Sequence, residues 1–144
     1  ATNNGYGINV QARNESPDYT SQTASLSGLD ISNNNVTGFA GGIVIHNKVD
    51  WASTTINNNA VVNCTQGIGA VIYPAGNMVN SSATLNVHGN SITGATYTVL
   101  NGSTNGASIN ADCNWHGIAT CAGVDALVVA APDTTAGPVI YTNW

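Results

Sequence analysis

The chain has 144 residues, a length that suits one domain. Its formal net charge is -5, and the basic residues are limited to Arg13 and Lys48. Because phosphate neutralisation needs clustered Lys and Arg, this composition excludes nucleic acid as a partner. No apolar run approaches the roughly 18 residues of a membrane-spanning helix, so we expect no membrane insertion.

The composition also favours strands over helices. Charged residues make up 6 % of the chain, and Lys, Glu, Gln, Arg and Met are rare, whereas Asn, Gly, Thr and Ser are abundant. Short β-branched runs bounded by Gly or Asn occur at residues 7–10, 42–45 and 70–73. Such runs predict strands that turn sharply at their ends, and they argue against a helical solenoid.

The first predicted strand, at residues 7–10, matches the last third of a repeat found further along the chain. Two interpretations fit this start: either upstream coils are missing from the sequence, or another molecule stacks on the open end. A polar insertion at residues 11–24, which contains Pro17, follows and predicts a long surface loop. That loop either binds a ligand or merely tolerates extra length.

Aliphatic residues then recur in three copies with a constant 12-residue offset between the first and third member. The copies are Ile31, Val36 and Ile43; Ile56, Val61 and Ile68; and Val87, Ile92 and Val99. Whole copies lie 25 and then 31 residues apart, so length varies in the connections and not within the copy. This pattern is typical of a solenoid. We expect Ile31, Ile56 and Val87 to form one inward column, and Ile43, Ile68 and Val99 another.

Asparagine clusters stand at equivalent places in two consecutive copies, at residues 33–35 and 57–59. Asn and Gly tolerate the left-handed backbone conformation that a corner between two strands requires. Strands of neighbouring copies stack about 4.8 Å apart, and stacked Asn side chains can bond to each other along such a ladder. We therefore expect Asn stacks at the corners.

The motif aliphatic-x-Asn-Asn-x-aliphatic-x-Gly, followed by Gly-aliphatic-x-aliphatic, resembles the repeats of right-handed parallel β-helix proteins, the superfamily that includes pectate lyases and many secreted bacterial proteins. The tail, INADCNWHG followed by GPVIYTNW, resembles the C-terminal end of bacterial cell-surface β-helix proteins. There an Asn-Trp-Trp-Gly segment precedes a last strand that ends in aromatic-x-Pro-Trp. In this chain His116 replaces the second Trp, and Asn143 replaces the Pro.

This resemblance implies an all-β fold, a right-handed parallel β-helix (solenoid) with a C-terminal cap, in an extracellular or cell-surface protein. At roughly 22 to 30 residues per coil, the chain holds about four to five coils. We expect one domain, with coils over residues 1–114 and the cap and last strand over residues 115–144. The segment GVDALVVAA predicts one short helix or an irregular cover within the cap.

Two of the three cysteines, Cys113 and Cys121, flank a loop that a disulfide can close, and Cys64 is left over. The alternative is that Cys64 and Cys113 simply occupy small, inward, apolar positions. A zinc site of Cys113, Cys121 and His116 is a weaker alternative, because the sequence lacks a close Cys pair.

No catalytic, cofactor-binding or metal-binding residue is predicted. The seven carboxylates are Glu15, Asp18, Asp30, Asp50, Asp112, Asp125 and Asp133. Thr55 and Asn86 stand at the positions equivalent to Asp30, so no acidic ladder forms along a face. His46 and His88 occupy different positions of the repeat and need not meet.

These observations predict a non-catalytic, extracellular structural or adhesive module that stacks head to tail into a cell-surface filament. Its expected partners are copies of itself or further β-helix coils, and surface glycans. The candidate assembly ends are Ile8, Val10, Val139, Tyr141 and Trp144.

The alternative function is a carbohydrate-binding or polysaccharide-degrading fragment. The aromatic residues Trp51, Tyr73, Tyr97 and Trp115 would either stack on sugars or shield the core. Ice binding is disfavoured, because the Thr-x-Thr step at residues 96–98 occurs once and is not repeated at equivalent positions.

Overall fold

The computed structural model describes residues 3–11, 28–46, 49–70, 83–103, 106–130 and 137–143, and in these ranges the chain forms three parallel β-sheets and one short helix. The first sheet contains, in order, β1 (Asn3–Gln11), β4 (Phe39–His46), β7 (Gln66–Ala70), β10 (Tyr97–Asn101) and β12 (Val128–Ala130). The second contains β13 (Val139–Ile140), β11 (Ile109–Asn110), β8 (Leu85–His88), β5 (Thr55–Asn57) and β2 (Asp30–Ser32). The third contains β3 (Asn35–Thr37), β6 (Ala60–Val62) and β9 (Ser91–Thr93).

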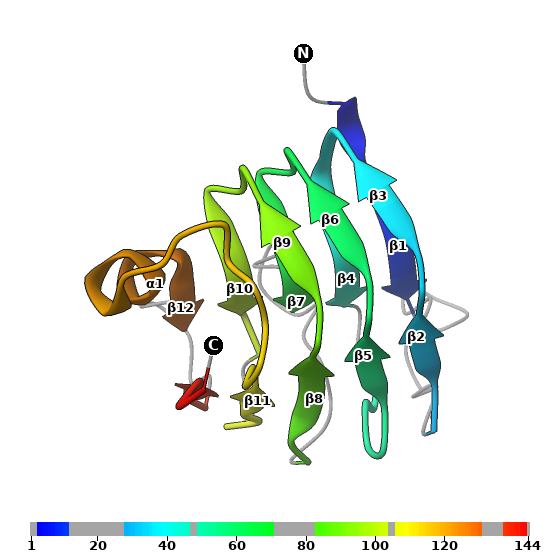
Figure 1. Ribbon diagram of the computed structural model, residues 1–144. Coiled ribbons are helices and arrows are strands. Elements are labelled where there is room, and N and C mark those ends of the chain that lie inside the picture. The colour runs from blue at the N-terminus through cyan, green and yellow to red at the C-terminus, as the bar shows by residue number, and fades with distance from the viewer. Residues whose placement is uncertain are drawn as a thin grey trace.

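The chain visits the three sheets in rotation. It passes through β2, β3 and β4, then β5, β6 and β7, then β8, β9 and β10, and we call each such set a repeat. In Figure 1 the second and third sheets form the near side of the molecule, and the first sheet lies behind them. The expected all-β, parallel architecture is confirmed, and it is compatible with a β-helix-like fold.

The predicted columns are present and buried. Equivalent residues pair in register, as in Ile31 with Ile56 and Ile56 with Val87. The second predicted column, Ile43, Ile68 and Val99, pairs in the same way and is fully buried. A third column of Val36, Val61 and Ile92 runs along the third sheet. Because every member of these columns is 9 % exposed or less, they form one continuous core.

Left-handed residues recur at two corners of the repeat and explain the richness in Asn and Gly. At the corner between the second and third sheets they are Asn33, Asn58, Gly89 and Cys113, with φ of 59°, 53°, 67° and 59°. At the corner that follows the third sheet they are Gly38, Asn63, Gly94 and Gly117. Gly and Asn adopt this conformation at low cost, so both corners can be built again in each repeat.

The first and third sheets approach closely because glycines face the third column. A Cβ built on Gly42 would lie 2.5 Å from Cγ1 of Val61, and one on Gly67 would lie 2.6 Å from Cγ2 of Ile92. The register places Thr98 at the equivalent position in the next repeat. Thr98 can carry a side chain there because it faces His116 and not an aliphatic residue.

The C-terminal part continues the sheets and adds a helix. Trp115 bridges Ser91 and so extends the third sheet by one short step. Helix α1 (Cys121–Leu127) begins after Thr120, whose hydroxyl accepts a hydrogen bond from the Gly123 N–H. The expected short helix is therefore present, but Val128–Ala130 of the same segment form β12 instead. Within the described ranges, no helix has the length and apolar character needed to cross a membrane.

Candidate functional site

A ladder of four asparagines joins the repeats at the corner between the second and third sheets. Its members are Asn34, Asn59, Asn90 and Asn114. In the first three members the side-chain Nδ2 donates to Oδ1 of the next asparagine at 2.9 Å, and the backbone N–H donates to the same oxygen at 2.9 to 3.0 Å. The remaining Nδ2 hydrogen binds backbone carbonyls; in Asn59, for example, it reaches the carbonyls of Asn57 and Ile31. The expected Asn stack is confirmed, and it continues beyond the two clusters to Asn90 in the third repeat and to Asn114 in the C-terminal part.

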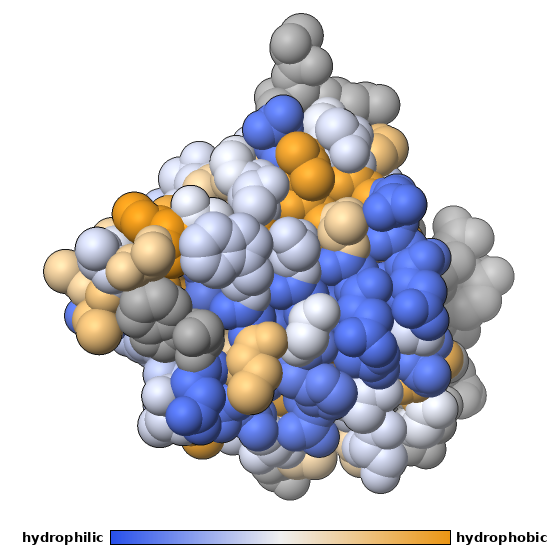
Figure 2. Space-filling model, viewed as in Figure 1, coloured by the Kyte–Doolittle hydropathy of each residue, from blue (hydrophilic) through white to orange (hydrophobic). Residues whose placement is uncertain are grey.

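A shallow, open groove of about 460 Å³ runs beside this ladder. Its lining residues are uncharged: Asn33, Asn34, Asn35, Asn58, Asn59, Ala60, Gly89 and Ser91. Figure 2 shows hydrophilic side chains gathered on this near face, around the corner between β2 and β3 and the corner between β5 and β6. The groove is therefore a polar surface without formal charge, supported from below by the ladder.

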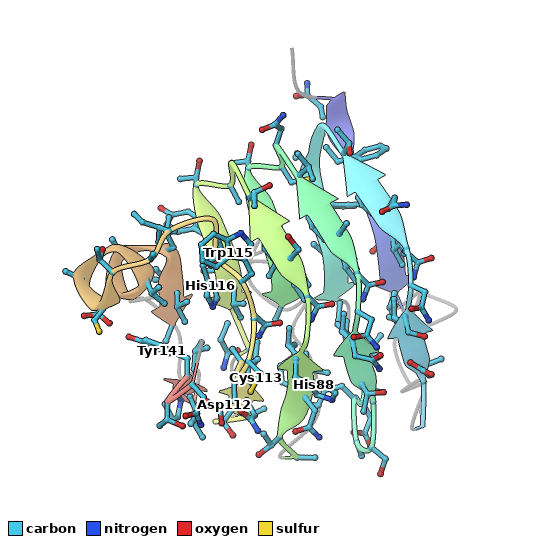
Figure 3. All side chains as sticks on the ribbon, in the orientation of Figure 1. His88, Asp112, Cys113, Trp115, His116 and Tyr141 are labelled. Carbon is cyan, nitrogen blue, oxygen red and sulfur yellow. The ribbon has the colours of Figure 1, made fainter. Side chains whose placement is uncertain are left out.

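Trp115 stands next to the end of this groove. It pairs with the groove residue Ser91, and 47 % of its surface is exposed. Figure 3 shows Trp115 beside β9, on the segment that climbs from Cys113 toward α1. The other aromatic candidates differ in their environment. Trp51 is fully buried, with Nε1 donating to the Ala83 carbonyl at 2.8 Å, and Tyr97 is 38 % exposed on the first sheet.

Tyr73, the last of the sugar-stacking candidates, lies outside the described residues. Of the three described candidates, Trp51 therefore shields the core, and Trp115 adjoins the groove.

The described carboxylates do not converge. Asp30 accepts from Asn57 Nδ2 at 3.1 Å, Asp50 from the Ala52 N–H at 3.0 Å, and Asp125 from the Tyr141 hydroxyl at 2.9 Å. Asp112 binds the Thr142 and Asn143 backbone instead. Glu15, Asp18 and Asp133 lie outside the described residues. Among the described residues, no cluster of three or more His, Cys, Asp or Glu exists that could hold a metal ion.

His116 occupies a core position that the sequence analysis did not predict. Because Trp115 pairs with Ser91, His116 follows Ile92 in the third column, and it is 2 % exposed. Its Nδ1 lies 2.7 Å from the hydroxyl oxygen of Thr98. That hydroxyl donates its one hydrogen to the Leu127 carbonyl at 3.3 Å, so it accepts from Nδ1. We therefore assign the proton to Nδ1, which leaves Nε2 unprotonated and without a hydrogen-bond partner among the described residues. Burial holds the pKa of this imidazole below its ordinary value.

The other two histidines lie elsewhere. His88 is exposed at the end of β8, and His46 ends β4. The two therefore belong to different sheets, as the sequence indicated.

The predicted disulfide is not formed in the structure. Cys113 and Cys121 are free and exposed, and Cys64 is free and buried in the core. The reason is the path of the chain. From Cys113 it runs alongside β9 through Trp115, so Cys121 begins α1 away from the corner that holds Cys113 (Figure 3). His116 points into the core while Cys113 faces solvent, so these residues are not brought together as zinc ligands either.

Two polar contacts attach the C-terminal segment to the rest of the fold. The Asp112 carboxylate accepts from the Thr142 hydroxyl at 3.1 Å and from the backbone N–H groups of Thr142 and Asn143. The Thr142 N–H, above all, holds the pKa of Asp112 below its ordinary value. The Tyr141 hydroxyl donates to Asp125 on α1, and this bond raises the pKa of Tyr141.

The candidate assembly ends lie at opposite ends of the first two sheets. Ile8 and Val10 belong to the edge strand β1 and are partly buried against the core. Val139 belongs to the edge strand β13, and Tyr141 follows it; both are also partly buried. Trp144 lies outside the described residues.

Comparison with known proteins found no match: no protein-family model, no curated protein and no solved structure matches the chain.

Proposed function

We propose that this chain is a right-handed parallel β-helix, a solenoid of about four to five coils, that serves as a non-catalytic structural or adhesive module of a secreted or cell-surface protein. The rotation of the chain through three parallel sheets supports the solenoid. Its direction supports the right-handed sense: in Figure 1 the chain climbs on the near side, descends on the far side and advances from β2 toward α1. The sequence resemblance supports the location.

The asparagine ladder carries the structural part of this proposal. Asn34, Asn59 and Asn90 each use the side-chain amide to bind the next ladder residue, and the three apolar columns continue alongside. In a solenoid each repeat contacts its immediate neighbours, so such bonds between repeats decide how stiff the whole stack is. A stack that is cross-linked at every step suits a rod that holds or spaces other parts of a surface.

The dispersion of ionisable groups supports a non-catalytic module. Each of the four described aspartates binds a different partner in a different place. Glycoside hydrolysis needs two carboxyl groups on either side of one bond, and β-elimination needs a positioned base. The polysaccharide-degrading alternative therefore has no support from the described residues.

An assay for glycan cleavage tests this proposal. We expect the purified chain to release no reducing ends or unsaturated products from pectin, alginate or a neutral plant polysaccharide during long incubation. An inactive sample must be shown to be folded, by a single cooperative unfolding transition in urea. Reproducible product release that one Asp or Glu substitution abolishes would contradict the proposed function.

A further inference from the structure

The groove beside the asparagine ladder combines an aromatic platform with unused amide groups. We propose that it binds a neutral oligosaccharide, with one sugar ring stacked on Trp115 and neighbouring sugar hydroxyls bound by the groove amides. This inference rests on the proposed adhesive role and names the class of ligand that the module would hold.

Free hydrogen-bonding groups line the groove. The side-chain amides of Asn33 and Asn35 are exposed and make no hydrogen bond to any described residue. Asn58 donates its Nδ2 to Asn57, and its Oδ1 accepts no bond from the described residues. An amide offers a donor and an acceptor side by side, and a sugar hydroxyl is both, so each amide can bind a pair of hydroxyls.

The spacing of the groove suits an elongated ligand. Asn35, Ala60, Ser91 and Trp115 occupy equivalent positions on four adjacent segments of the third sheet. With strands about 4.8 Å apart, the distance from Asn35 to Trp115 is roughly 14 Å, which accommodates a short oligosaccharide. Ala60 and Ser91 have small side chains, and the exposed Trp115 is the next residue in the same row.

The ladder makes this surface rigid before any ligand binds. Asn34 and Asn59 contribute to the groove lining, and their amides are already fixed by bonds to the next repeat. A preorganised polar surface loses little conformational entropy on binding, which favours recognition through a few hydrogen bonds and one stacked ring.

The absence of charge in the lining selects the class of ligand. All eight lining residues are neutral. An acidic glycan would gain no ion pair here. An ice surface would need a flat, regular face, whereas the side chains at equivalent positions differ in size and the surface is concave.

Binding of defined pentasaccharides to the full chain tests the inference. The neutral probes are cellopentaose, mannopentaose and chitopentaose, and the acidic probe is pentagalacturonate, each followed by titration calorimetry. We expect at least one neutral probe to bind. Trp115→Ala should weaken that binding about tenfold or more, and Trp115→Tyr should restore part of it, because an aromatic platform is retained.

Two further variants separate the groove from other surfaces. Ala60→Phe should abolish binding, because its side chain would fill the floor of the groove. Tyr97→Ala removes an exposed aromatic ring from the first sheet and should leave the affinity unchanged. Each variant must unfold in urea with a single transition before its affinity is compared.

The inference is overturned if no neutral probe binds at millimolar concentration, if pentagalacturonate binds most tightly, or if Trp115→Ala and Ala60→Phe leave the affinity unchanged. Product release from a probe in the same samples would contradict the proposed non-catalytic function, while the effect of these variants on affinity would still decide the binding site.

Discussion

Asn59 in the ladder makes hydrogen bonds to both neighbouring repeats. Asn59 accepts bonds from the Asn34 backbone and side chain, and it donates to the Asn57 and Ile31 carbonyls and to Asn90. Asn59→Ala leaves several of these buried groups without partners, so we expect the free energy of unfolding to fall by about 3 kcal/mol. Urea denaturation followed by circular dichroism measures this change.

Asn35→Ala is the matched control, because Asn35 is exposed and lies one residue beyond the ladder. Its substitution should change the free energy of unfolding by less than about 0.5 kcal/mol. Equal losses in the two variants would mean that the ladder bonds contribute nothing beyond the general effect of removing an Asn.

His116 gives the core a pH dependence. Its folded-state pKa is lowered by burial, whereas its unfolded-state pKa is the ordinary 6.5. The stability it contributes is therefore fully present above about pH 6.5 and is lost as the pH falls from there through the folded-state pKa. His116→Val, which restores the residue type found elsewhere in this column, should remove that loss.

The measurement is the urea midpoint at about pH 7.5 and about pH 5 for the original chain, His116→Val and His88→Asn. The aspartates are common to all three proteins, and His88 is exposed, so the difference between the two His variants isolates His116. An unchanged pH dependence in His116→Val would refute the assignment of a buried, neutral imidazole.

At the scale of single residues, those that follow the repeat could be predicted from the sequence, and those that depart from it could not. Ile56 and Ile68 recur at fixed spacing and could be placed in the core with no structure. His116 could not, because a polar ring breaks the apolar pattern and its partner Thr98 lies on another sheet. Cys113 gave no signal either: its left-handed backbone follows from its place before Asn114, whereas Cys itself has no preference for that conformation.

At the scale of elements, glycines set the distance between the first and third sheets. A Cβ at Gly67 would meet the Thr98 carbonyl and lie 2.6 Å from Cγ2 of Ile92. Because backbone atoms cannot move aside cheaply, we expect Gly67→Ala to lower the free energy of unfolding by about 3 kcal/mol. Thermal and urea unfolding of the purified variant both test this value.

Gly28→Ala is the control, since no heavy atom lies within 4 Å of a Cβ built there. Its φ of 79° still makes Ala unfavourable, at a cost of about 1 to 2 kcal/mol. If Gly28→Ala proved the more damaging of the two, the close approach of the sheets at Gly67 would not be what limits the side chain there.

Elements with a clear period could be predicted from that period. The long strand β4 carries a β-branched run between Gly and His. By contrast, β12 contains three residues, too few to show any period, and the two residues of β13 were expected as a last strand only through the resemblance of the tail. Their place follows from tertiary pairing with β10 and β11. The same limit hides the groove, whose residues come from three separate repeats and meet through the parallel register.

At the scale of the whole molecule, the two ends of the stack differ in what they present. At one end the first and second sheets stop at β1 and β2, and at the other they stop at β12 and β13. The ladder also has a direction, because Asn34, its first member, donates to the next asparagine while its own Oδ1 accepts no hydrogen bond from any described residue. Among the described strands, no further strand pairs with the outer side of β1, β2, β12 or β13, and such an edge of a parallel sheet is a template for another strand.

We therefore expect two copies of this chain to associate head to tail, with β1 and β2 of one molecule continuing the sheets beyond β12 and β13 of the next. Light scattering and sedimentation should detect association that grows with protein concentration. Salt should change it little, because the described contact strands carry few charges, Asp30 on β2 being one. Val10→Asp should abolish it, since a charge would be buried beneath the neighbour, whereas Asn9→Asp adds the same charge at an exposed site of the same strand and should have a much smaller effect.

Circular dichroism must first establish that both variants fold. A folded original chain that stays monomeric at high concentration would leave the head-to-tail contact without support, and equal responses of the two variants would place any association at a surface other than the core-facing side of β1.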